Sequence, residues 1–243
     1  MLGGALNAVA GGGTFLTFPA LIFLGVPPVN ANATSTVALW PGQWASVAAY
    51  RRELVRHERS LVVVLATASM SGGLAGSLLL LNTPQTTFLR LIPYLLLAAT
   101  LLFAFGRNVT VLVMARARTQ HTTHDKPLLA IWIAQFFMAV YGGYFGAGLG
   151  ILMLAAFVAL GIDDLQEANA LKTLLAACIN GVAVVVFVVS GIVYWPQAIV
   201  MLIGAIVGGY GAASMARRID PKWLRAFVIA VGLSMTVAFF LRT

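Results

Sequence analysis

Long apolar segments separated by short charged connections constrain this chain more than any other feature. About 20 apolar residues in a helix span the ~30 Å hydrocarbon core of a bilayer. The segments cover residues Leu2–Leu24, Ala31–Tyr50, Leu61–Leu81, Phe88–Phe105, Leu128–Leu160, Ala168–Val189, Pro196–Ala216 and Trp223–Leu241. Only 9% of the residues are charged, which excludes a soluble globule and a disordered chain. Unbroken runs also exclude a transmembrane barrel, so we predict an all-α polytopic membrane protein.

The net charge of +8 has to be weighed against membrane topology before it is assigned to a partner. In a soluble protein a basic excess suggests nucleic acid, but here the bases follow the connections, so we expect a lipid bilayer and no nucleic acid. The lone Cys178 excludes an internal disulfide. His121 and His124, with only Asp125 nearby, are more typical of a solvated loop than of a metal site. We therefore expect no metal and no cofactor.

The two halves of the chain match each other at an offset of 137 positions. The matched pairs are Gly11 with Gly148, Gly13 with Gly150, Asn32 with Asn169, Ala33 with Ala170, Thr36 with Thr173 and Gln43 with Asn180. Glycine and alanine are common in membrane helices, so the polar matches carry the inference. We predict a first membrane repeat over residues 1–105, a cytoplasmic linker over 106–127 and a second membrane repeat over 128–243.

The segment Leu128–Leu160 is too long for one crossing, because its 33 residues would make about 50 Å of helix. Its centre, Tyr141–Gly150, contains five glycines, where a helix can break and fold back as a hairpin. With a fold-back, 13 of the 15 Lys and Arg residues lie in cytoplasmic connections, against nine with a single crossing. The positive-inside rule therefore favours two inverted repeats, each a glycine-broken hairpin plus three transmembrane helices. By the repeat, Leu2–Leu24 forms the other hairpin, and because no basic start precedes it we expect it to remain in the mature protein.

Each glycine cluster is expected at a hairpin tip near the middle of the membrane. The first amides of the following arm lack intrahelical partners, and that end of the helix dipole is positive, so the tip favours an anion. Successive glycines can also form a concave nest of N–H groups. The alternative is that each glycine only permits close helix packing. The candidate tip residues are Gly12, Gly13, Thr14, Gly148 and Gly150.

Uncharged polar residues form a stripe after each hairpin, within about 40° of one helix face at 100° per residue. The stripes consist of Asn32, Thr36 and Gln43 in the first half and Asn169, Thr173 and Asn180 in the second. Such donors suit a ligand that must be desolvated and released again. The alternative is interhelical hydrogen bonding that only fastens the bundle.

The two stripes differ at one position, where Ser35 of the first half corresponds to Lys172 of the second. Both are candidate binding residues. Lys172 lies just inside a helix start next to a glycine hairpin and could be a fixed countercharge for an anion. Alternatively, it could pair with Glu167 or Asp164 at the membrane surface.

All seven acidic residues fall in connections or at segment ends, so no buried carboxylate is expected to relay protons or to catalyse a reaction. Common hydrolase motifs are also missing, so we expect no catalytic residues and no enzyme, unless Cys178 is reactive. Ladders of small residues predict close helix contact, inside the bundle or between protomers. The ladders are Ala68, Gly72 and Gly76 in the first half and Gly204, Gly208 and Ala212 in the second.

These motifs together resemble the TauE/SafE family of sulfite and organosulfur anion exporters. The resemblance rests on Asn7–Gly13, Pro19 and Ala33–Ser35 in the first half and on Gly146–Gly150, Glu167–Thr173 and Asn180 in the second. It covers essentially the whole chain. One departure is the first hairpin arm, which is shorter than its counterpart at Leu128–Gly143, so the arm is abbreviated or the N-terminus lies upstream. The resemblance implies a transporter of sulfite, thiosulfate, sulfonates or related small anions.

Taken together, these patterns predict a multi-pass permease of the cell inner membrane with its anion site between the two hairpin tips. An interior-negative potential of about 100 mV drives each negative charge outward with about 2.3 kcal/mol, so export needs no proton or sodium partner. The alternative is an anion-binding membrane scaffold or sensor that transports nothing. A homo-oligomer is compatible with either function.

Overall fold

A computed structural model gives the fold, and it describes residues 13–54, 58–119, 128–160, 162, 164–215 and 221–241. Within these residues the chain is all-helical, as predicted. The helices are α2 (Thr14–Phe23), α3 (Pro28–Ala49), α4 (Arg51–Leu54), α5 (Arg59–Leu81), α6 (Gln85–Thr119), α7 (Leu128–Tyr144), α8 (Leu149–Ala159), α9 (Leu165–Val189), α10 (Trp195–Met215) and α11 (Pro221–Phe240). Because α6 continues to Thr119, the first part of the linker expected over 106–127 is helical.

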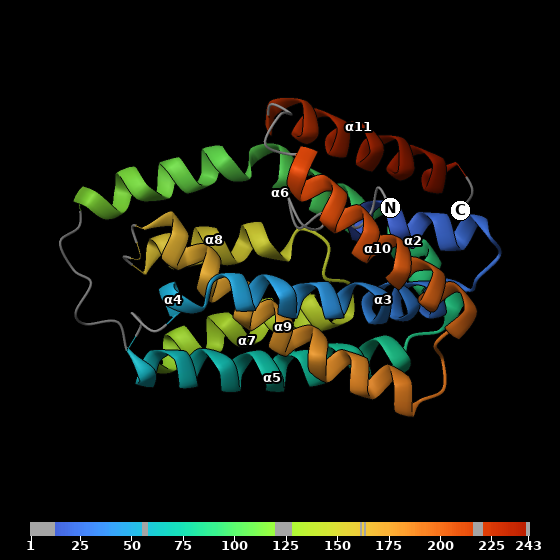
Figure 1. Ribbon diagram of the computed structural model, residues 1–243, viewed down its shortest axis with the longest axis horizontal. Helices are drawn as coiled ribbons and strands as arrows, with labels where there is room; N and C mark the ends of the chain where they lie inside the picture. The colour runs from blue at the N-terminus through green and yellow to red at the C-terminus, as the bar shows by residue number, and fades with distance from the viewer. Residues whose placement is uncertain are drawn as a thin grey trace.

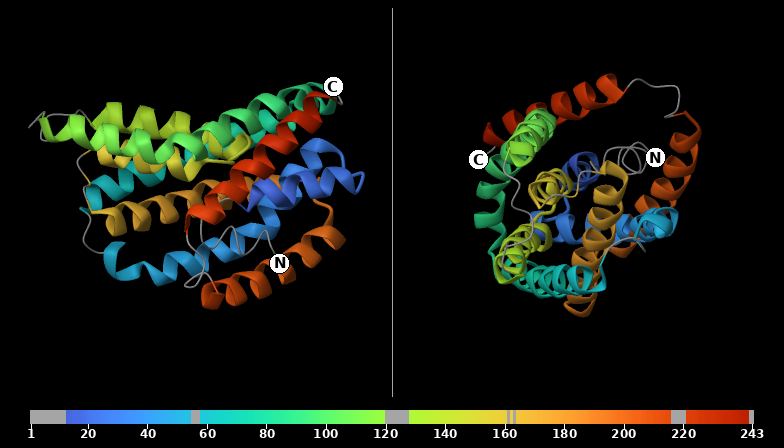
Figure 2. Two further views of the ribbon diagram at one scale, coloured as in Figure 1. Left: turned by 90° about the horizontal axis from the view of Figure 1, so that it is seen from above. Right: turned by 90° about the vertical axis from the view of Figure 1, so that its left-hand side faces the viewer.

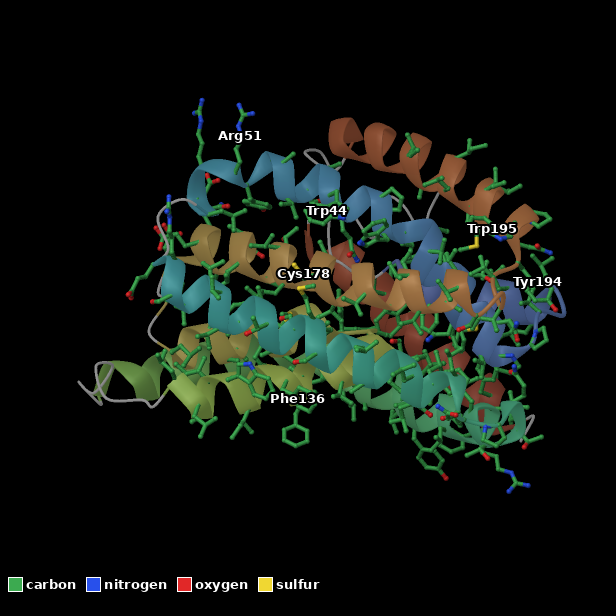
Figure 3. All side chains as sticks on the ribbon, turned by 90° about the horizontal axis from the view of Figure 1, so that it is seen from below. Trp44, Arg51, Phe136, Cys178, Tyr194 and Trp195 are labelled. Carbon is green, nitrogen blue, oxygen red and sulfur yellow. The ribbon has the colours of Figure 1, made fainter. Side chains whose placement is uncertain are left out.

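Most of the helices run roughly lengthwise, and several of their turns gather at the two ends of the molecule (Figure 1). Helix α4 and the starts of α5, α7 and α9 lie at one end, and the α2–α3, α5–α6 and α9–α10 turns lie at the other. Figure 3 places Arg51 at the first end and Tyr194 and Trp195 at the second. We call these the Arg51 end and the Tyr194 end. End-on, α5, α6, α10 and α11 lie around the periphery and α8 lies inside (Figure 2).

The long fifth segment breaks within its glycine-rich centre, as predicted. Helix α7 ends at Tyr144 and α8 begins at Leu149. The turn between them contains Gly146 (φ +76°) and Gly148 (φ +77°), whose backbone conformation would be strained in a residue with a side chain. Figure 1 shows α8 returning from the turn toward the Arg51 end. With 17 and 11 residues, the two arms are about 25 Å and 16 Å long, so neither spans the ~30 Å core. Of the first hairpin, the described residues contain only the second arm, α2.

The closest helix contact is between α5 and α7, and it uses the predicted ladder of small residues. The Val140 carbonyl occupies the space that a Cβ on Gly76 would need, and the Phe136 carbonyl does the same at Gly72. Gly143 on α7 approaches the backbone of Gly73 equally closely. The ladder therefore makes contact inside the bundle, where small residues let two backbones meet. Its counterpart on α10 includes Gly208 and Ala212, which lie outside the residues whose surroundings are described.

Apolar helices with exposed apolar side chains identify the lipid-facing surface. Three helical stretches in the described residues are long and apolar enough to cross a membrane, namely Arg59–Leu81, Gln85–Gly106 and Gln166–Val189. Four apolar stretches are shorter: Thr14–Phe23, Leu128–Tyr144, Trp195–Ile206 and Ala226–Phe240. Large exposed apolar residues include Val63, Met70, Leu74 and Leu78 on α5, Leu91 and Leu101 on α6, Ile199, Val200 and Ile203 on α10, and Leu233 and Val237 on α11. This pattern is that of a multi-pass membrane protein.

The α5–α7 contact predicts opposite effects of alanine at two helical glycines. Gly76→Ala forces the helices apart and should destabilise the protein by about 1–3 kcal/mol. At Gly42 on α3 no neighbouring atom lies within 4 Å of the position that a Cβ would take, so Gly42→Ala should be neutral or stabilising by about 0.5–1 kcal/mol. Thermal unfolding of both variants in detergent measures the difference. Equal unfolding midpoints would contradict the close contact.

Candidate functional site

A cavity of about 400 Å³ lies between α3, α8 and α9 and is closed on other sides by the start of α2 and by Phe103 of α6. Its polar lining consists of Thr14, Thr36, Gln43, Ser46, Tyr50, Asn169, Lys172, Thr173 and Asn180. Its apolar lining consists of Leu39, Phe103, Phe145, Leu149, Ile151, Leu154 and Ala176, with Gly146, Gly148 and Gly150 beside them. The cavity therefore has a polar wall on α3 and α9 and a mainly apolar wall on α6 and α8.

Most of the predicted site residues come together in this cavity, although they are far apart in the sequence. Those that line it are Thr14, Thr36, Gln43, Gly148, Gly150, Asn169, Lys172, Thr173 and Asn180. Gly13, Asn32 and Ser35 are buried outside the lining. Gly12 lies outside the described residues.

The polar wall is held together by hydrogen bonds across the α3–α9 contact. Asn180 Nδ2 donates to Gln43 Oε1 at 3.0 Å, which leaves the amide of Gln43 to donate elsewhere. Thr36 Oγ1 and Thr173 Oγ1 each donate to the carbonyl four residues earlier, at 2.9 Å and 2.7 Å. Because those hydroxyl protons are used, Lys172 and the side-chain amides of Gln43 and Asn180 are the readier donors to an anion.

Lys172 is the only cation among the described lining residues, and that lining contains no Asp or Glu. Its Nζ donates to Asn169 Oδ1 at 2.8 Å, which uses one of its three protons. Asp164, a predicted alternative partner, instead caps α9 by accepting a hydrogen bond from the Gln166 amide at 2.7 Å. In its protonated form Lys172 gives the described lining a net positive charge.

Two helix starts add to the positive potential of the cavity. Thr14 begins α2, and Gly148, Leu149 and Gly150 lie at the start of α8. The first amides of a helix have no intrahelical acceptors and carry the positive end of its dipole. A Cβ on Gly150 would lie 3.3 Å from Lys172 Cδ, so the lysine side chain runs directly over this helix start. The side chain of Lys172 therefore reaches from α9 to the start of α8.

Asn32 and Ser35 hold helices together instead of reaching the cavity. Asn32 Nδ2 donates to the Tyr144 carbonyl at the end of α7, at 3.0 Å, and Ser35 Oγ lies 2.7 Å from Thr17 Oγ1 on α2. Both side chains are 1% exposed or less. Asn32 lies on the predicted face of α3. The hairpin turn, however, contacts α3 one turn before Thr36 and occupies the space beside Asn32. For these two residues the structure shows the interhelical bonding that was the alternative interpretation.

Several lining residues were not predicted from the sequence, among them Ser46, Tyr50, Phe103 and Phe145. A signal existed for the first two, because at 100° per residue both fall within about 40° of the Asn32 stripe. The two phenylalanines carry no such signal, since aromatic residues are common in every apolar segment. Only the tertiary packing places them beside the polar wall.

Comparison with known proteins assigns the chain to a family. The family described as Sulfite exporter TauE/SafE matches residues 1–239 of this chain. The chain belongs to the TauE/SafE family. The family resemblance found in the sequence is thereby confirmed, and the chain is a multi-pass membrane transporter.

Several TauE/SafE relatives align along almost the whole chain. The probable membrane transporter protein of Haemophilus influenzae is 28% identical over 95% of this chain and 88% of its own length. The probable membrane transporter protein YfcA of Escherichia coli K12 is 27% identical over 97% of this chain and 85% of its own length. The probable membrane transporter protein ORF9 of a Sinorhizobium species is 25% identical over 97% of this chain and 87% of its own length. No solved structure gives a significant match.

Because Asn32 is buried and bonded to another helix, its replacement should destabilise the protein more than replacement of Thr36. Asn32→Ala leaves the Tyr144 carbonyl at the end of α7 without its donor and should cost about 1–3 kcal/mol. Thr36→Ala removes a hydroxyl bonded within its own helix and should change stability by less than about 0.5 kcal/mol. Thermal unfolding in detergent compares the two. A larger loss in Thr36→Ala would mean that the two residues have been assigned the wrong roles.

Proposed function

We propose that this TauE/SafE transporter moves a small sulfur-containing anion, such as sulfite or a sulfonate, across the cell inner membrane through this cavity. The observation that carries the proposal is the position of Lys172, a cation beside the α8 start in a cavity whose described lining contains no acid. A tetrahedral or pyramidal oxyanion can accept several hydrogen bonds at once, and lysine and amide donors supply them. The family description, Sulfite exporter TauE/SafE, supports sulfur oxyanions within this class.

The packing supports the proposal that the two halves are inverted repeats. If α3 corresponds to α9, α5 to α10, α2 to α8 and α6 to α11, each contact should have a counterpart. Helix α5 packs on α9 as α10 packs on α3, and α8 packs on α6 as α2 packs on α11. The pairs α3–α9 and α6–α11, which would map onto themselves, are also in contact. This exchange of partners is what a pseudo-two-fold axis requires.

Two hydrogen bonds support an axis that passes through the α3–α9 contact. Gln43 bonds to Asn180, and Trp40 Nε1 donates to the Ala177 carbonyl at 3.0 Å; both pairs are separated by 137 residues, the offset of the repeat. Residues related by a two-fold axis can touch each other only beside that axis. We therefore propose that Gln43 and Asn180 lie at the axis and present similar amides to a ligand from both halves. The boundaries 1–105, 106–127 and 128–243 remain part of this proposal.

The charge distribution supports placing the Arg51 end in the cytoplasm. Arg51, Arg52 and Arg59 lie in or beside α4 at this end. At the Tyr194 end, Tyr194 and Trp195 are exposed by 38% and 51%, as is typical of aromatic residues at a membrane interface. In this orientation, an interior-negative potential drives the anion outward, which makes export the favoured direction.

Replacing Lys172 tests the anion site. Lys172→Gln should weaken binding of sulfite or ethanesulfonate at least tenfold, because the cavity loses its charge while the amide can still bond to Asn169. Arg90→Gln is the matched control, since Arg90 is an exposed cation on α6 outside the cavity. Calorimetric titration of the purified variants measures affinity, and their unfolding midpoints check the fold. Unchanged affinity in a folded Lys172→Gln variant would remove the site.

Flux in proteoliposomes separates transport from the scaffold or sensor alternative. Labelled sulfite should move in response to a clamped potential in wild type, and its flux should fall in Lys172→Gln but not in Arg90→Gln. The pH and sodium gradients are imposed separately at constant potential. Binding without flux would favour a sensor, and flux that follows an ion gradient and ignores the potential would contradict uncoupled export.

A further inference from the structure

Three phenylalanine rings from different parts of the chain pack edge to face inside the bundle. Phe145 in the hairpin turn lies with its ring centroid 5.6 Å from Phe18 of α2 and 6.4 Å from Phe88 of α6. Phe18 and Phe88 are 6.3 Å apart, so each ring contacts the other two. All three residues are 3% exposed or less. We call Phe18, Phe88 and Phe145 the ring layer.

The ring layer lies at the end of the cavity that is farther from the Arg51 end. Phe145 belongs both to the ring layer and to the cavity lining. In the other direction the lining follows α3 through Ser46 to Tyr50, next to α4. No described lining residue belongs to the turns at the Tyr194 end. The cavity therefore extends from the ring layer toward the Arg51 end alone.

Beyond the ring layer, packed apolar residues continue to the Tyr194 end. Phe18, Phe88 and Phe145 share a core cluster with Val26 of the α2–α3 turn and Val193 of the α9–α10 turn, both buried. A hydrated anion would have to shed its water to enter such a layer, which is costly without compensating donors. Closely packed rings are therefore an effective barrier.

The hairpin turn that carries Phe145 is tied to its neighbours by a few directional contacts. The Tyr144 carbonyl accepts a hydrogen bond from Asn32 Nδ2, and the Tyr144 ring lies 5.6 Å from Phe88. Tyr141 Oη donates to the Ala147 carbonyl within the turn. On the far side of Phe145 the chain passes through two glycines with positive φ, Gly146 and Gly148. The turn is thus held by a few hydrogen bonds and ring contacts, between α7 and the short α8.

We propose that the ring layer is the gate of the cavity on the Tyr194 side, that it is closed in this structure, and that movement of the hairpin turn with Phe145 opens it. The gate rests on the proposed transport function, because a binding protein needs only one entrance. Since Phe145 also lines the cavity, an occupied site contacts the residue that must move.

Cysteine accessibility tests the gate without measuring transport. In a Cys178→Ala background, Ala176→Cys places a thiol in the cavity lining, and a negatively charged, membrane-impermeant methanethiosulfonate is applied to either side. Arg52→Cys and Asn82→Cys, both at exposed positions, identify the Arg51 and Tyr194 sides in intact cells and inverted vesicles. With the ring layer intact, the cavity cysteine should react from the Arg51 side only.

Opening the ring layer should then give access from the second side. Phe88→Ala should raise the labelling rate of Ala176→Cys from the Tyr194 side at least tenfold. Phe157→Ala is the matched control, because Phe157 is an equally buried phenylalanine of α8 outside the ring layer. Phe145→Leu, a milder change, replaces Phe88→Ala if that variant fails to fold.

Two results would overturn the gate. One is labelling of the cavity cysteine from the Tyr194 side when the ring layer is intact, and the other is no gain in folded Phe88→Ala and Phe145→Leu variants. Neither result bears on anion binding by Lys172, so failure of the gate and failure of the proposed function are distinguishable.

Discussion

The need to satisfy backbone hydrogen bonds away from water governs the centre of this molecule. A helix that stops inside a bilayer exposes amides and carbonyls to hydrocarbon, which is tolerated only where protein or a water-filled cavity surrounds them. The turn between α7 and α8 meets this condition on both sides. Asn32 and Tyr141 supply donors to its carbonyls, and its other face borders the polar cavity. The helix therefore breaks at the edge of the polar cavity.

Much of this arrangement could be predicted from the sequence because it depends on backbone geometry. Glycine allows positive φ and close helix approach whatever surrounds it, so the break near Gly146 and the contact at Gly76 followed from the residues alone. The polar stripe on α9 was equally predictable. Helical periodicity fixes which side chains share a face, and lipid leaves polar residues only inward directions.

What could not be predicted depends on where the elements stop against one another. Asn32 and Thr36 share a stripe, yet only Thr36 reaches the cavity, because the hairpin turn contacts α3 at Asn32. Phe103 comes from a different helix, and no local pattern distinguishes it from the apolar residues around it. The extension of α6 past residue 106 was also missed, since polar residues after an apolar run are typical of a loop and of a helix leaving the membrane.

One difference between the halves has a consequence for how the transporter works. Ser35 and Lys172 stand at matched positions of the sequence, but Ser35 is bonded to Thr17 in the packed interior while Lys172 faces the cavity. If the halves exchange conformations during transport, the charge stays with one half. The states open to either side would then hold the anion against different surroundings and with different strength. Such a transporter would bind the anion with different affinities from its two sides, while the membrane potential still sets the direction of net transport.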